Sequence, residues 1–133
     1  MEQEDGKAGR FGDGSDEIIG AAMEVHRELG PGLLESAHED CFCYELSLRG
    51  LRFQRQVPLP LVYKGLQLDQ GYRLDVVVEG KLIVEIKAVE RLLPIHEAQA
   101  ITYLKLTGLN TALLINFNAA VLKHGIRRLS RKL

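Results

Sequence analysis

The sequence predicts an α/β (α+β) fold in which helices flank a central mixed β-sheet. Two segments with apolar residues at helical spacing come first, and short segments rich in β-branched residues follow. A further helical segment precedes the last strands, and the order α-α-β-β-β-β-α-β is typical of a mixed sheet covered by helices. At 133 residues the chain is long enough for one domain, which we expect at residues 15–133 after a disordered, Gly-rich leader at residues 1–14.

Two helices are predicted in the first third of the chain. The first begins near Ser15 or Asp16 and ends at residues 30–32, because glycine favours the position after a helix and proline cannot continue one. The second spans about residues 33–49 and is followed by Gly50. Its apolar residues at helical spacing, which we expect to face the core, are Leu34, Ala37, Cys41 and Leu48.

The middle and the end of the chain predict the sheet. Strands are expected at residues 53–57, 61–63, 72–78, 82–87 and 111–117, and a short strand or helix near residues 121–129. A third helix is expected at residues 94–107, since Pro94 suits a first helical turn and Gly108 suits the position after the last.

Composition favours a cytoplasmic protein. The chain is 46% hydrophobic and 26% charged, and it has no apolar run near the ~18 residues that a membrane-spanning helix needs. Its first residues lack the apolar segment of a secretory signal. Cys41 and Cys43 point to different sides of a helix, so we expect two reduced cysteines and no disulfide between them.

The net charge of −1 is unevenly distributed. Residues 1–17 carry six acidic and two basic side chains, and the rest of the chain carries a net charge of +3. The terminal segment KHGIRRLSRKL has five basic residues and no acidic one. It could contact phosphates or be a solvated terminus. Charge alone therefore does not identify a nucleic-acid-binding protein.

The strongest functional pattern is Asp75 followed by Glu85-Ile86-Lys87. Arg73 shares a strand face with Asp75, and Lys87 shares one with Glu85, because side chains alternate along a strand. A three-residue turn at residues 79–81 would place Asp75 opposite Glu85. A two-residue turn would move Glu85 to the other face, so a site here requires the longer turn.

Two neighbouring carboxylates repel each other, and a divalent cation is the natural compensation. Oxygen ligands with retained waters suit Mg²⁺, or Mn²⁺ in its place. Such a metal activates water and neutralises phosphate charge, and Lys87 adds a positive charge beside it. The alternative is a surface strand with ordinary cross-strand ion pairs. The apolar runs at residues 76–78 and 82–84 argue against it, because they indicate strands covered on both faces.

Several segments resemble known proteins. DVVVEGKLIVEIK, residues 75–87, looks like the Asp…Glu-X-Lys core of the PD-(D/E)XK nuclease superfamily. GLLESAHE at 32–39, GYRLD at 71–75, IVEIKAVE at 83–90 and PIHEAQAITYLKLTGL at 94–109 resemble the small bacterial GxxExxY proteins. The resemblance runs from about Ile18 to Leu129, and it implies a restriction-endonuclease-like core.

The resemblance also implies roles for single residues. Asp75, Glu85 and the backbone carbonyl of Ile86 would bind the metal, Lys87 would be the catalytic lysine, and Glu35 would be a further metal or water ligand. Gln99 and Tyr103 match a Gln-X-X-X-Tyr element that supports the site and the bound strand in RecB-like members. Residues expected to bind substrate or support the site are thus Gln99, Tyr103, His38 and Arg73. His38 stands where the GxxExxY motif has tyrosine, which leaves open whether this helix keeps its usual role.

These observations together predict a Mg²⁺-dependent phosphodiester hydrolase that acts on DNA. The alternative is a catalytically inactive nuclease-like module that binds nucleic acid or a protein partner, and a homodimer is a third reading. No membrane partner is expected.

Overall fold

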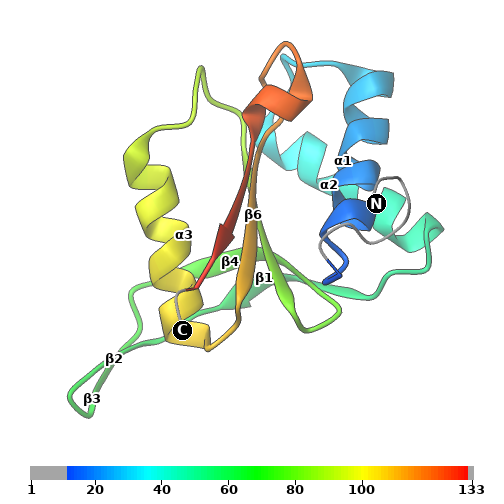
Figure 1. Ribbon diagram of the computed structural model, residues 1–133. Helices are drawn as coiled ribbons and strands as arrows, with labels where there is room; N and C mark the ends of the chain where they lie inside the picture. The colour runs from blue at the N-terminus through cyan, green and yellow to red at the C-terminus, as the bar shows by residue number, and fades with distance from the viewer. Residues whose placement is uncertain (1–11, 132–133) are drawn as a thin grey trace.

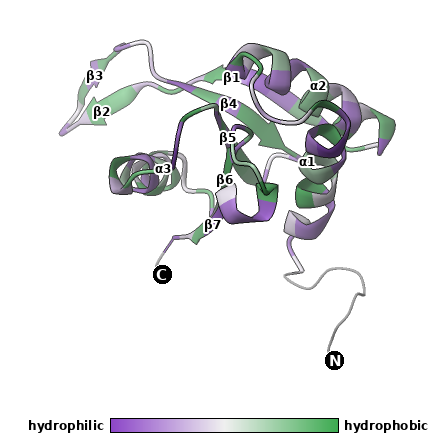
Figure 2. Cartoon of the chain, turned by 90° about the horizontal axis from the view of Figure 1, so that it is seen from above, coloured by the Kyte–Doolittle hydropathy of each residue, from purple (hydrophilic) through white to green (hydrophobic). Residues whose placement is uncertain are grey.

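The computed structural model describes residues 12–131, so most of the predicted leader and residues 132–133 lie outside the described part. Within residues 12–131, a five-stranded mixed sheet is flanked by three α-helices (Figure 1). Helices α1 (Ser15–Leu29) and α2 (Glu35–Leu48) lie on one side of the sheet, and α3 (Pro94–Thr107) lies on the other (Figure 2). This arrangement confirms the predicted fold class.

The strand order explains why a helix connects two neighbouring strands of the sheet. The sheet runs β1-β4-β5-β6-β7, and its bounds are Phe53–Pro58, Arg73–Val78, Leu82–Lys87, Thr111–Asn116 and Ile126–Ser130. Strands β5 and β6 are parallel and are connected through α3, whereas the other neighbours are antiparallel. A parallel pair needs such a crossover, because a tight turn cannot join the ends of two parallel strands. The 3₁₀ helix η1 (Leu122–Gly125) leads into β7.

A separate hairpin extends from the sheet. Strands β2 (Leu61–Tyr63) and β3 (Leu66–Leu68) pair only with each other in the described part of the chain, and they project past the α3 side (Figures 1 and 2). The sequence predicted β2 but not β3. Lys64 and Gly65 form the tip, and both have the left-handed backbone that such short turns require.

The register of β4 and β5 follows the longer turn. Val78 pairs with Leu82, Val77 with Ile83 and Val76 with Val84. Continued by one step, this register would bring Asp75 opposite Glu85, but the backbone pairing ends at Val76 and Val84. The two strands are buried on both faces, as their near-continuous apolar runs predicted.

Each face of the sheet has its own core. Toward α1 and α2, alternate residues of β4, β5 and β6 pack around Phe42, Leu46 and Phe117. Toward α3, the intervening residues Val77 and Ile83 pack against its buried side chains. Every residue of β6 is buried, which is expected for a parallel strand between two layers.

The predicted buried face of α2 is only partly correct, because Cys41 packs against the core but two of the predicted leucines do not. Leu34 is 76% exposed and Leu48 is 64% exposed. The helix instead buries His38, Glu39, Phe42, Cys43 and Leu46. A hydropathy pattern misplaces this face, because two of the buried side chains are polar and are compensated by contacts from other elements.

Two further expectations concern redox state and membranes. Cys41 and Cys43 are both free thiols, as predicted, and burial raises the pKa of Cys43 to about 11. No helix in the described part of the chain is long and apolar enough to span a membrane. Near the predicted end of the leader, Asp13 accepts hydrogen bonds from Ser15 and Arg128.

Candidate active site

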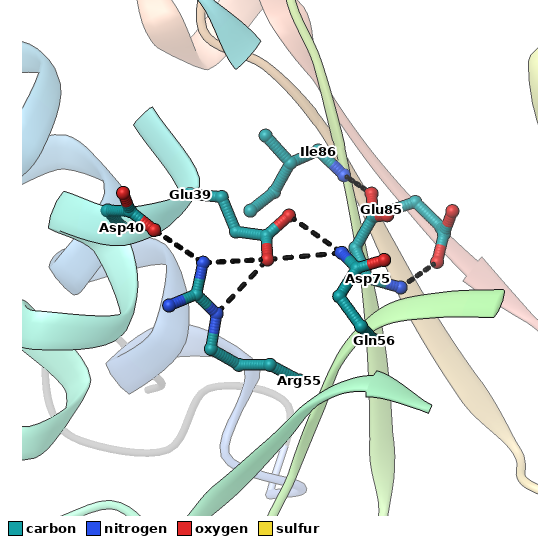
Figure 3. A network of polar contacts seen from close by, with 7 residues as sticks. All are labelled: Glu39, Asp40, Arg55, Gln56, Asp75, Glu85 and Ile86. Carbon is teal, nitrogen blue, oxygen red and sulfur yellow. Dashed lines mark hydrogen bonds and ion pairs between the residues drawn. The ribbon is translucent and has the colours of Figure 1, made fainter. Parts of the chain in front are cut away.

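Asp75 and Glu85 lie where the backbone pairing of β4 and β5 stops. The last ladder pair is Val76 with Val84. Beyond it, the backbone amide of Asp75 donates to the carboxylate of Glu85 at 3.0 Å, and the amide of Ile86 donates to the carboxylate of Asp75 at 2.8 Å. Each carboxylate therefore joins the two strands at a point where backbone groups would otherwise meet (Figure 3).

The strict alternation predicted for β4 fails at the same point. Leu74 and Val77 pack in one core cluster, although alternation would put them on opposite faces. On the neighbouring strand, Gln56 has a φ of 50°, a left-handed conformation that is unusual for a residue other than glycine. It lies between the paired residues Arg55 and Val57, opposite Asp75. Strict alternation along β4 therefore does not hold from Leu74 to Val77, because the ladder is distorted here.

The electrostatics of the pair favour a compensating cation. Burial and, after it, the charge of Asp75 raise the pKa of Glu85 to about 8, although the Asp75 amide and Lys87 oppose the shift. Burial also raises the pKa of Asp75, and the charges of Glu39 and Glu35 add to the effect. Negative charge is therefore costly here in the absence of a cation.

Lys87 lies two residues after Glu85 on β5. It follows Glu85 on the same strand face, is half-buried, and lowers the pKa values of both Asp75 and Glu85. Within residues 12–131 its ammonium group forms no hydrogen bond or ion pair. The ammonium is therefore available to an anion that enters the site.

Two glutamates of α2 approach the site, and the sequence predicted only one of them. Glu35 is exposed at the first position of the helix. Glu39 lies one turn later and is buried, with 8% of its side chain exposed. Residues four apart share a helix face, so the position of Glu39 could have been read from that of Glu35.

Glu39 is held by side chains of β1, as Figure 3 shows. Its carboxylate accepts hydrogen bonds from Arg55 Nε at 3.1 Å and Nη2 at 3.0 Å, and from Gln56 Nε2 at 3.2 Å. Arg55 also pairs with the exposed Asp40 at 2.6 Å. This network connects α2 to the distorted residue opposite Asp75. Sequence alone does not reveal it, because the partners lie on different elements.

His38 has a different environment from Glu35. Its side chain is fully buried, its ring stacks on Phe117 with centroids 4.8 Å apart, and its Nε2 is 3.0 Å from the carbonyl of Gly30. Phe117 in turn donates its amide to the carbonyl of Lys87. His38 is thus a core residue, and Phe117 links it to the strand that carries Lys87.

Gln99 and Tyr103 lie on the other side of the sheet, on α3. They line one groove of about 210 Å³ together with Leu61, Tyr72, Thr102 and Leu106. Burial raises the pKa of Tyr103, and the charges of Glu85, Tyr72 and Asp75 raise it further. Tyr103 is therefore within electrostatic reach of both carboxylates. Arg73 is exposed at the start of β4, and its Nη1 donates to the carbonyl of Gln56 at 3.3 Å.

The donor chemistry suits a hard cation. In the part of the chain that the structure describes, no three His, Cys, Asp or Glu side chains lie close enough to hold a metal ion by themselves. Half-buried Asp75 and buried Glu85 nevertheless offer carboxylate oxygens with raised pKa values. A cation such as Mg²⁺ keeps several waters and needs only one or two carboxylates. The two residues therefore fit a partly hydrated ion of this kind.

Comparison with known proteins gives one match. A family model described as the PD-(D/E)XK nuclease superfamily matches residues 13–129, which include every candidate residue named above. No curated protein and no solved structure matches the chain.

Proposed function

Because the chain belongs to the PD-(D/E)XK nuclease superfamily, we propose that it is a Mg²⁺-dependent hydrolase of phosphodiester bonds in DNA. One observation carries the proposal: Asp75 and Glu85 meet at the end of the β4–β5 ladder, and Lys87 follows on the same strand. The mixed sheet flanked by helices is consistent with a restriction-endonuclease-like core. Within the superfamily, the GLLESAHE segment supports a relationship to the GxxExxY proteins.

Asp75 and Glu85 would hold the metal, and the carbonyl of Ile86 would be the third protein ligand. The Ile86 amide points toward Asp75, and a residue in an antiparallel strand directs its N–H and its carbonyl to the same neighbour. Glu35 would bind the ion or one of its waters. When bound, Mg²⁺ would lower the pKa of a water molecule and neutralise charge on the phosphate.

The other residues would act directly on substrate. Lys87, whose ammonium has no partner in the described chain, would position the attacking water or stabilise the negative charge that develops on the phosphate. Gln99, Tyr103 and Arg73 would hold the strand that carries this phosphate. His38 would support the site indirectly through Phe117.

The direct test is cleavage of single- and double-stranded DNA by the purified protein in Mg²⁺ or Mn²⁺. We expect cleavage that EDTA stops and that Asp75→Ala abolishes. A protein that binds DNA but cuts neither form would instead be the inactive binding module. Cleavage that survives Asp75→Ala would show that the activity belongs to a contaminant.

A further inference from the structure

A groove lies between the base of the β2–β3 hairpin and α3. Its volume is about 210 Å³, and its walls are Leu61, Tyr72, Gln99, Thr102, Tyr103 and Leu106. Two aromatic rings and two leucines supply apolar surface, while one amide and three hydroxyl groups can form hydrogen bonds. Tyr72 is 44% exposed and so presents its ring to an incoming molecule.

Tyr103 connects this groove to the strands of the candidate metal site. Tyr103 packs in the same core cluster as Val77 and Ile83, which lie on the two strands that carry Asp75 and Glu85. Within residues 12–131 nothing forms a hydrogen bond to its hydroxyl group. A molecule anchored at the carboxylates could therefore extend along Tyr103 into the groove.

We propose that the groove holds one unpaired base of the nucleic-acid strand whose phosphate is bound at Asp75 and Glu85, so that the preferred substrate is single-stranded. This inference rests on the proposed function. Flat aromatic rings stack on bases of any sequence, and amide and hydroxyl groups bind the polar edge of a base. A paired base is enclosed by its neighbours and its complement, and it can enter such a groove only after leaving the duplex.

The test measures binding of a fluorescein-labelled oligonucleotide by anisotropy in Ca²⁺, with the DNA shown to remain intact on a gel. The wild-type protein should bind a single strand more tightly than a blunt duplex of the same sequence. Tyr72→Ala should weaken single-strand binding about tenfold, the loss expected for one stacked base. Tyr72→Phe should retain the affinity, because it keeps the ring.

Two controls separate base stacking from a general loss of binding. Tyr63→Ala removes an exposed tyrosine of the β2–β3 hairpin that does not line the groove, and should leave the affinity unchanged. A series of oligonucleotides with a single abasic position should include one that binds the wild type about as weakly as Tyr72→Ala binds the intact strand. That oligonucleotide should be insensitive to Tyr72→Ala.

Equal affinity for single and double strands, an unchanged affinity in Tyr72→Ala, or no abasic position that weakens binding would overturn the inference. Its failure is distinguishable from failure of the proposed function. If the protein binds single strands in a Tyr72-dependent way but never cuts them, the groove is a base-binding site and the proposed nuclease activity is wrong. If cleavage depends on Asp75 but is unaffected by Tyr72→Ala, the nuclease activity is supported and the role of the groove is wrong.

Discussion

The backbone amide of Asp75 donates a hydrogen bond to the side chain of Glu85 across the β4–β5 pair, at 3.0 Å. A carboxylate here replaces the backbone partner that a regular ladder would supply. The hydrogen bond fixes the orientation of Glu85 before any ligand arrives, and a preoriented group loses less entropy on binding. This bond uses one oxygen of Glu85 and leaves the second available. The carboxylate can therefore accept the hydrogen bond from β4 and bind a cation at the same time.

Mn²⁺ should stabilise the folded protein. A cation between Asp75 and Glu85 would relieve the repulsion that raises the pKa of Glu85, and a ligand that binds only the native state at 100 times its Kd adds about 2.7 kcal/mol. We expect the Tm to rise with Mn²⁺ concentration in differential scanning calorimetry. Asp75→Asn should abolish the rise, and Asp69→Asn, at an exposed loop position, should not. An equal rise in all three proteins would place the ion elsewhere.

Lys87→Ala should separate metal binding from chemistry. Removal of a group that stabilises transition-state charge lowers kcat by about 10²–10³. Because Lys87 is not expected to be a metal ligand, the Mn²⁺ affinity measured by calorimetric titration should be retained. Lys81→Ala, at the exposed turn of the same hairpin, is the matched control and should cut normally. Full activity of Lys87→Ala would remove this residue from the mechanism.

Stability without metal should fall as the pH rises. The pKa of Glu85 is raised from its ordinary value of 4.5 to about 8 in the folded state. Between these values the folded protein binds more protons than the unfolded one, so the free energy of unfolding decreases with pH. The decrease is at most about 1.4 kcal/mol per pH unit for one group. Asp75, whose pKa is also raised, adds to it in the acidic range.

Urea unfolding in EDTA at pH 5, 7 and 9 would measure this slope. Glu85→Gln carries no titratable proton and should show a smaller decrease between pH 5 and pH 9. The free energy of unfolding of Glu85→Gln should therefore increase relative to that of the wild type as the pH rises. An identical slope in the two proteins would mean that Glu85 ionises normally.

The buried carboxylate of Glu39 should make Arg55 important for stability. Arg55→Ala leaves that carboxylate with Gln56 alone, and the loss of hydrogen bonds to a charged group costs about 2 kcal/mol. Asp40→Ala removes a partner of Arg55 that is 68% exposed, and it should cost less than about 1 kcal/mol. Chemical denaturation would measure both. A double-mutant cycle of Glu39→Ala with Arg55→Ala should give a clear coupling energy, and additive effects would contradict the pairing.

Local signals were sufficient for part of the fold. Strand β5 has the predicted bounds, because its apolar residues on both faces identify a covered strand. Helix α3 also has the predicted bounds, since Pro94 and Gly108 mark its ends. The predicted three-residue turn gave the β4–β5 register up to Val76 and Val84, and Asp75 and Glu85 follow directly, joined by a hydrogen bond from the Asp75 amide to the Glu85 carboxylate.

Tertiary contacts decided the rest. The buried face of α2 could not be read from hydropathy, because His38 is compensated by Phe117 and Gly30, and Glu39 by Arg55 and Gln56. The distortion at Asp75 depends on the left-handed backbone of Gln56, a residue with no glycine-like signature in the sequence. Strand β3 was missed because a three-residue strand carries little periodic signal.

The closeness of Asp75 and Glu85 along one hairpin also bears on how the chain folds. Closing the short turn at residues 79–81 costs little entropy, so these like charges meet through local contacts while both are still hydrated. Burial comes only when the helices dock on the two faces of the sheet. The electrostatic cost of the site then falls on a late step of folding, and refolding followed by stopped-flow fluorescence of a dye that reports helix docking should slow from pH 5 to pH 9 in EDTA. In such a chain the hairpin positions the two carboxylates early in folding, and the free-energy cost of burying their charge arises late.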